Sequence, residues 1–284
     1  MTDPAPLRDY LLASRNPGGG WGYVRGKSSR LEPTCCALLA LGADGEDAPL
    51  RTWPARDGLL LERVGGEPNY GFQALALLAL GAARQEHQAG NRALLAGLQR
   101  AGGVRLAPST VNRQDNHLEG WSWFADTFSW IEPTAWGVLA LKRARKLGWD
   151  GVEESRLKES ESVLFDRVCS LGGWNYGNSN MLGRELHPYV PTTAIALLAL
   201  HDRRDDPAVQ HSVEFLQRQA TWECSSYALG LSAIALRAYG CDVTGVIDAL
   251  TRQIPITYDL GQQLGLAVAM LALQEENARA AFDL

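Results

Sequence analysis

Six nearly all-apolar phrases recur along the chain, and each ends in an Ala-Leu or similar pair. They are residues 35–41, 74–80, 135–141, 194–200, 229–236 and 266–273. A helix that is apolar on every side cannot face water, so the phrases predict six buried helices. Their recurrence over the whole chain predicts one supersecondary unit that is used six times.

A more amphipathic helix precedes each apolar phrase, with apolar residues at helical spacing, as at Val209, Val213 and Leu216. The second of these outer helices, near residues 49–64, is the weakest because a proline and a glycine interrupt it. Six outer–inner hairpins closed into a ring bury every inner helix without capping repeats. The pattern therefore predicts an all-α (α/α)6 toroid. An open helical solenoid is the alternative, and it should carry a more polar terminal repeat.

The repeat leaves no room for a second domain in a chain of 284 residues, 46% of them hydrophobic. We therefore expect a single toroid domain over residues 1–284. The spacing between phrases is larger in two places. This predicts long loops at about residues 102–130 and 172–190, and long loops on a rigid scaffold often carry function.

Charge and cysteine usage exclude several classes of protein. The net charge is −5 with Lys and Arg scattered, so no basic stripe indicates nucleic-acid binding. No apolar run reaches membrane-spanning length. The five cysteines form no C-x-x-C pair, and the first residues lack the basic and apolar regions of a signal peptide. A cytoplasmic protein with reduced thiols is the prediction.

Glycine and tryptophan stand together before three of the apolar helices. The segments are Gly18–Tyr23, Gly120–Trp123 and Gly172–Tyr176. Glycine supplies the positive φ that ends a helix, and the aromatic ring can then pack over the turn. We expect most of these tryptophans to be structural wedges rather than ligand contacts.

These Gly-x-x-x-Trp turns, followed by Pro-Thr-Ala-x-x-Leu-Leu-Ala-Leu helices, resemble the prenyltransferase and squalene-cyclase repeats. Such repeats occur in protein prenyltransferase β subunits and in class II terpene cyclases, which share the (α/α)6 toroid. The resemblance runs from about Leu7 to Leu273. It implies a prenyltransferase-like or terpene-cyclase-like protein that binds or converts an isoprenoid, or its diphosphate, in an apolar central cavity. The helix N-termini would gather at one mouth of the ring, which favours an anionic group.

Two near-identical helix starts carry the candidate acids, Glu32 within residues 29–34 and Glu132 within residues 129–134. In a purely structural interpretation, the following proline takes the first helical position and the glutamate complements the helix dipole. The resemblance to the Asp-x-Asp-Asp-Thr-Ala motif of class II cyclases implies instead that Glu132 and Glu32 are catalytic acids. The neighbouring aspartates of that motif are replaced by Trp130 and Pro133. A lone glutamate in an apolar lumen has a raised pKa and is a weak acid, which argues against alkene protonation.

Residues of the loops and helix starts are the candidate substrate contacts. For the anionic end of a ligand they are Arg25, Lys27, Arg30, Arg113 and Arg184, and for the walls of the cavity they are Trp123, Phe128, Trp130 and Tyr176. Guanidinium groups pair well with phosphate oxygens. Ordinary solvated loop polarity is the alternative explanation for the charged residues.

No metal site is predicted. The Asp-x-Cys pair that holds zinc in prenyltransferases is matched only by Trp222-Glu223-Cys224, and the five histidines show no ligand spacing. Magnesium would enter only with a diphosphate substrate. The missing acid motif leaves a second hypothesis open, a non-catalytic toroid that acts as a ligand-binding or protein-interaction scaffold with a protein partner.

Overall fold

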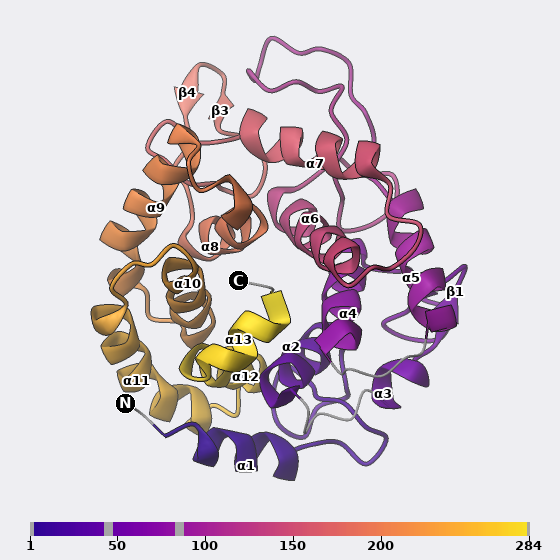
Figure 1. Cartoon of the computed structure of the whole chain (residues 1–284), viewed down its shortest axis with the longest axis vertical. Coiled ribbons are helices and arrows are strands. Elements are labelled where there is room, and N and C mark those ends of the chain that lie inside the picture. The colour runs from indigo at the N-terminus through magenta and orange to yellow at the C-terminus, as the bar shows by residue number, and fades with distance from the viewer. Residues whose placement is uncertain (1–2, 43–47, 83–87, 283–284) are drawn as a thin grey trace.

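The computed structural model describes residues 3–42, 48–82 and 88–282, and its helices form a closed double ring (Figure 1). The inner wall consists of α2 (Leu31–Leu41), α4 (Tyr70–Ala82), α6 (Ile131–Lys146), α8 (Val190–Ala199), α10 (Ser226–Ala238) and α12 (Gln263–Leu273). Each inner helix packs against the next, and α12 packs against α2. The predicted all-α (α/α)6 toroid is therefore confirmed, and the open solenoid is excluded.

Amphipathic helices form the outer wall. They are α1 (Ala5–Ala13), α5 (Gln88–Arg100), α7 (Glu154–Asp166), α9 (Pro207–Gln219) and α11 (Thr244–Asp259). In the second unit the outer element is reduced to the single turn α3 (Ala48–Arg51) and an antiparallel hairpin of β1 (Ala55–Arg56) and β2 (Leu59–Leu60). Asp57 and Gly58 both have positive φ, as a two-residue hairpin turn requires. The interruption predicted near residues 49–64 is thus a short β-hairpin in place of a continuous outer helix.

The two long loops lie between α5 and α6 and between α7 and α8. The second contains a hairpin of β3 (Asn180–Met181) and β4 (Arg184–Glu185). The loops contact each other, because the Leu182 N–H donates to the Val111 carbonyl at 2.6 Å and the Arg113 guanidinium lies 2.8 Å from Glu185. The 3₁₀ turns η2 (His201–Arg203) and η3 (Ala220–Trp222) follow α8 and α9.

A tryptophan clasp joins each of three turns to its neighbouring helices. The Trp121 N–H donates to Thr134 Oγ1 at 3.0 Å, and the indole Nε1 donates to the Leu98 carbonyl at 2.8 Å, at the end of α5. The same contacts recur between Trp21, Thr34 and Leu11 and between Trp174, Thr193 and Leu164. All three indoles are buried. The structural role predicted for these tryptophans is confirmed, and the Pro-Thr phrase is explained by packing.

The glycine before each of these tryptophans leaves room for the threonine side chain. In Gly120→Ala the new Cβ would overlap the Thr134 side chain, which is buried and hydrogen-bonded. We expect this change to lower the free energy of unfolding by about 2 kcal/mol, the cost of overpacking a filled core. Urea denaturation measures it. Gly90→Ala on α5 is the matched control, because a Cβ there meets open space. Equal free energies of unfolding for Gly120→Ala and Gly90→Ala would contradict the claim that Gly120 is required for packing of the clasp.

The short helix α13 (Glu275–Phe282) crosses the centre of the ring (Figure 1). The amide of Asn277 donates to the carbonyl of Ala40, near the end of α2. Phe282 is buried, and its ring lies 6.0 Å from the ring of Trp136 on α6. The sequence analysis did not anticipate this helix. Its consequence is that the chain's own side chains fill the centre of the ring at this level.

Across the described ranges, no helix combines the length and apolarity that crossing a bilayer would require.

Candidate active site at the mouth of the ring

One position in the first turn of each inner helix marks the end of the toroid at which the inner helices begin. Aligned on the last leucine of each phrase, these positions are Glu32, Gly71, Glu132, Pro191, Tyr227 and Leu264. We call this set the mouth ring. Its polar members Glu32, Glu132 and Tyr227 belong to α2, α6 and α10, which alternate around the inner wall. Burial raises the pKa of the Tyr227 hydroxyl, and Glu132 and Glu32 raise it further, so the three groups lie within electrostatic range of one another.

The local sequence places both glutamates in a first helical turn. Trp130 and Arg30 have extended backbone, and the helices begin at the following residue. The sequence analysis expected each proline at the first helical position. Pro33 and Pro133 instead stand third in their helices. Proline is tolerated there because the first N–H groups of a helix have no partner within it.

Glu132 is a partly buried carboxyl group without a hydrogen-bond partner among the described residues. Burial raises its pKa from 4.5 to about 8, and the nearby Glu32 carboxylate contributes to the increase. Its acid form therefore dominates at neutral pH. A partly buried acid without a hydrogen-bond partner is characteristic of functional sites.

Glu32 has the same helical position but a different environment. Burial raises its pKa, the Tyr23 hydroxyl opposes this by donating a hydrogen bond of 2.7 Å to Oε2, and Glu62 raises the pKa further. The hydrogen bond favours the ionised form of Glu32 over that of Glu132. Two carboxyl groups with different environments at one site are a common basis for an acid and a base role.

The raised pKa of Glu132 makes stability depend on pH. The native state binds this proton more tightly than the unfolded chain, so the stabilisation is complete below the ordinary pKa of 4.5 and is lost as the pH rises toward about 8. Glu132→Gln cannot ionise and avoids the loss. A pKa unit corresponds to about 1.4 kcal/mol, and water screens a partly buried group, so we expect the variant to gain about 2 kcal/mol over the native chain between about pH 5 and about pH 9.

Urea denaturation at both pH values measures this gain. Glu154→Gln, at the exposed start of α7, is the matched control because it removes one carboxylate far from the mouth ring. Parallel pH dependence of the native chain and Glu132→Gln would show that Glu132 has an ordinary environment.

The predicted cationic contacts are divided among several partners. Arg30 pairs with Glu62 at 2.7 Å and Arg113 pairs with Glu185 at 2.8 Å. The Arg25 guanidinium lies 5.6 Å from the centre of the Tyr10 ring. Lys27 and Arg184 are exposed, the latter on β4. Two of the five charges are thus already balanced by carboxylates of the chain.

The predicted aromatic residues lie at the helix starts around Glu132. Phe128 and Trp130 stack at 4.5 Å, and the Tyr176 carbonyl accepts a hydrogen bond from the N–H of Ile131, the residue before Glu132. Trp123 covers Gly71, where an added Cβ would stand 2.7 Å from the indole. These residues therefore lie near the starts of α4 and α6. The sequence analysis did not single out Tyr23 or Tyr227, although Tyr227 occupies the aligned position of the two glutamates.

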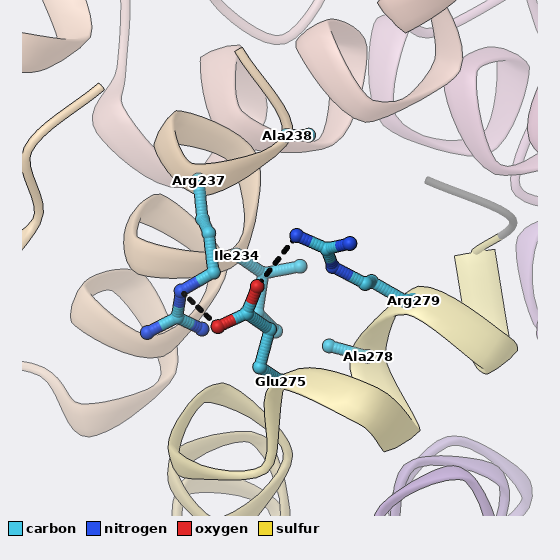
Figure 2. A pocket seen from close by; sticks show the side chains of 6 residues that line it. All are labelled: Ile234, Arg237, Ala238, Glu275, Ala278 and Arg279. Carbon is cyan, nitrogen blue, oxygen red and sulfur yellow. Dashed lines mark hydrogen bonds and ion pairs between the residues drawn. The ribbon is translucent and has the colours of Figure 1, made fainter. Parts of the chain in front are cut away.

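The opposite face carries a cavity of about 220 Å³ between α10 and α13 (Figure 2). Its carboxylate, Glu275, lies 2.6 Å from Arg279 and 3.8 Å from Arg237. Both oxygens of Glu275 are paired with guanidinium groups. This cavity therefore contains no counterpart of the unpartnered acid Glu132 among its described lining residues. Within the described ranges, no group of three or more His, Cys, Asp or Glu side chains could hold a metal ion.

Comparison with solved structures places this ring among known toroids. An endo-β-1,4-glucanase from Acetobacter xylinum matches with a TM-score of 0.62 and 13% identity over 99% of each chain. An α-amylase from Clostridium perfringens matches with a TM-score of 0.65 and 12% identity over 95% of this chain and 96% of that one. A GH76 α-mannanase from Bacteroides thetaiotaomicron matches with a TM-score of 0.61 and 10% identity over 97% of this chain and 96% of that one. At these identities the likeness establishes the fold.

No protein-family model matches the chain, and no curated protein matches its sequence.

The expected kinship with prenyltransferases and terpene cyclases, and with it an isoprenoid ligand, is wrong. Solved structures that match over nearly the whole chain include glycoside hydrolases and a cellobiose epimerase. The physical reason lies in the motifs that suggested the kinship. The Gly-Trp turns and Pro-Thr helix starts form the tryptophan clasps, so they report how the ring packs rather than what it binds. The deep apolar lumen expected for an isoprenoid is also occupied, because Phe282 and Trp136 pack within it.

Proposed function

We propose that this chain is a carbohydrate-processing enzyme that hydrolyses a glycosidic bond at the mouth ring. The observation that carries the proposal is Glu132, an acid without a hydrogen-bond partner in the described part of the chain, whose pKa is raised to about 8, within electrostatic range of the hydrogen-bonded carboxylate of Glu32. The similar solved toroids support this assignment, because their names describe a glucanase, an amylase and a mannanase.

Each carboxyl group has a distinct part in the proposed reaction. Glu132 donates its proton to the oxygen of the glycosidic bond as the bond to the anomeric carbon breaks. Glu32 either removes a proton from the attacking water or attacks the anomeric carbon itself, and water then releases the sugar. In both routes one water molecule is consumed. Its hydroxyl group ends on the anomeric carbon, and one proton ends on the leaving oxygen. Glu32→Gln removes the second carboxylate in either route.

The test is a hydrolysis screen with the full chain on carboxymethyl cellulose, starch and yeast α-mannan, with chromatographic detection of released sugars. We expect release from at least one polymer, with a rate that falls as the pH rises through about 8, where Glu132 loses its proton. Analysis of the first product by NMR distinguishes retention from inversion at the anomeric carbon. Absence of release from all three polymers and their oligosaccharides would overturn the proposal.

A further inference from the structure

A groove of about 770 Å³ lies on the rim of the toroid beside the mouth ring. Its walls come from the turn before α8, the start of α8 and the outer helix α9, and Glu223 closes the side toward α10. The volume falls within the range of small-molecule and cofactor sites.

The groove shares one residue with the mouth ring and has a backbone contact to the start of α6. Pro191, a member of the mouth ring, is also one of its lining residues. At the α6 side the lining residue Tyr176 accepts, through its carbonyl, a 2.9 Å hydrogen bond from the N–H of Ile131. Glu132 is the next residue along α6, so the Tyr176 end of the groove is the end nearest to the acid in the chain's own contacts.

The side chains of the groove combine exposed aromatic faces with hydrogen-bonding groups. The rings of Tyr176 and Tyr189 lie 4.8 Å apart and are tilted by 46°, and these residues are 51% and 45% exposed. Opposite them, α9 contributes His211 and Arg218, both exposed. Aromatic faces can pack against the C–H faces of sugar rings, while imidazole and guanidinium groups bond to hydroxyls. The groove thus offers hydrogen-bonding groups that a purely apolar ligand would not use, although Arg218 also lies 3.7 Å from Glu214 on the same helix.

We propose that the substrate is a chain of several sugar units, which extends from the bond beside Glu132 along this groove over Tyr176 and Tyr189. The inference rests on the proposed function and adds the class of substrate, an oligosaccharide or polysaccharide rather than the glycoside of a single sugar. Glu132 then cleaves within the chain, and the groove holds the units on one side of the cleaved bond.

The experiment measures kcat/KM on gluco- and manno-oligosaccharides from dimer to hexamer, together with binding of the same sugars to Glu132→Gln by calorimetry. We expect kcat/KM to rise at least about tenfold from dimer to hexamer. Tyr176→Ala and Tyr189→Ala should lower the hexamer-to-dimer ratio by about tenfold, the value of one lost stacking contact. Tyr189→Phe, which keeps the ring, should restore the ratio. Tyr258→Ala is the matched control, because Tyr258 is similarly exposed (47%) but lies on α11, away from the groove.

The outcomes separate this inference from the proposed function. Turnover whose kcat/KM does not depend on chain length would overturn the proposed role of the groove but not the proposed hydrolysis. A hexamer-to-dimer ratio that neither tyrosine change affects would have the same meaning. Length-dependent binding that requires the two tyrosines, without any turnover, supports the groove and overturns hydrolysis. Neither binding nor turnover overturns both.

Discussion

Glu132→Gln is expected to lower turnover of the cleaved saccharide by about 10²- to 10⁴-fold, the usual contribution of a positioned general acid. The substitution keeps the size of the side chain and its hydrogen-bonding capacity but removes the transferable proton. Since the carboxyl group has no partner among the described residues, its loss breaks no contact within the fold. The variant should therefore fold as the native chain does and retain oligosaccharide binding. Steady-state kinetics with calorimetry separates the two effects.

Controls make this result specific to the acid. Glu154→Gln, at the exposed start of α7, should turn over at the native rate. Substrates with a better leaving group need less proton donation, so aryl glycosides of the same sugar should lose less than the natural substrate in Glu132→Gln. The decline of activity as the pH rises through about 8 should also disappear. Turnover at the native rate in Glu132→Gln would show that another group donates the proton to the glycosidic oxygen.

The fold could be read from the sequence because its strongest signal is repetition. Six apolar phrases specify six buried helices, and a ring is the arrangement that buries them all. The pattern misled at the level of chemistry. Threonine after proline and tryptophan after glycine resemble one enzyme family, yet each residue is explained by a hydrogen bond in a clasp, as between Thr134 and Trp121. Residues that a scaffold requires carry little information about its substrate.

The candidate site was only partly accessible from the sequence. Glu32 and Glu132 stand out because they recur at one aligned position. The groove was not predicted because its walls are distant in sequence, with Tyr176 before α8 and His211 on α9. Helix α13 was also missed, although Ala278, Ala281 and Phe282 have the spacing of one buried helical face. Burial of the unpartnered acid depends on the closed ring, which no local window of sequence contains.

A buried ion cluster outside the site gives the other large expected effect. Lys142 near the end of α6 is 8% exposed, and its Nζ lies 2.6 Å from Glu161 on α7 and 2.5 Å from Asp202 in η2. It also donates to the carbonyl of Ala199, the last residue of α8, at 2.8 Å. One ammonium group thus joins three consecutive helical elements of the ring. Glu161, equally buried, completes the cluster through Arg203 at 2.7 Å.

Lys142→Met is expected to lower the free energy of unfolding by about 3–5 kcal/mol, because it leaves the buried Glu161 carboxylate without its closest cation. The double variant Lys142→Met/Glu161→Leu should recover most of that loss, since replacing both members of a buried pair by apolar groups removes the unpaired charge. Arg145→Met is the matched control on the same helix. Its pair with Glu154 is about half exposed on both sides and should be worth less than about 1 kcal/mol. Urea denaturation of the four proteins tests the cluster. If Lys142→Met costs no more than Arg145→Met, water reaches Glu161 and the charges do not hold α6, α7 and η2 together.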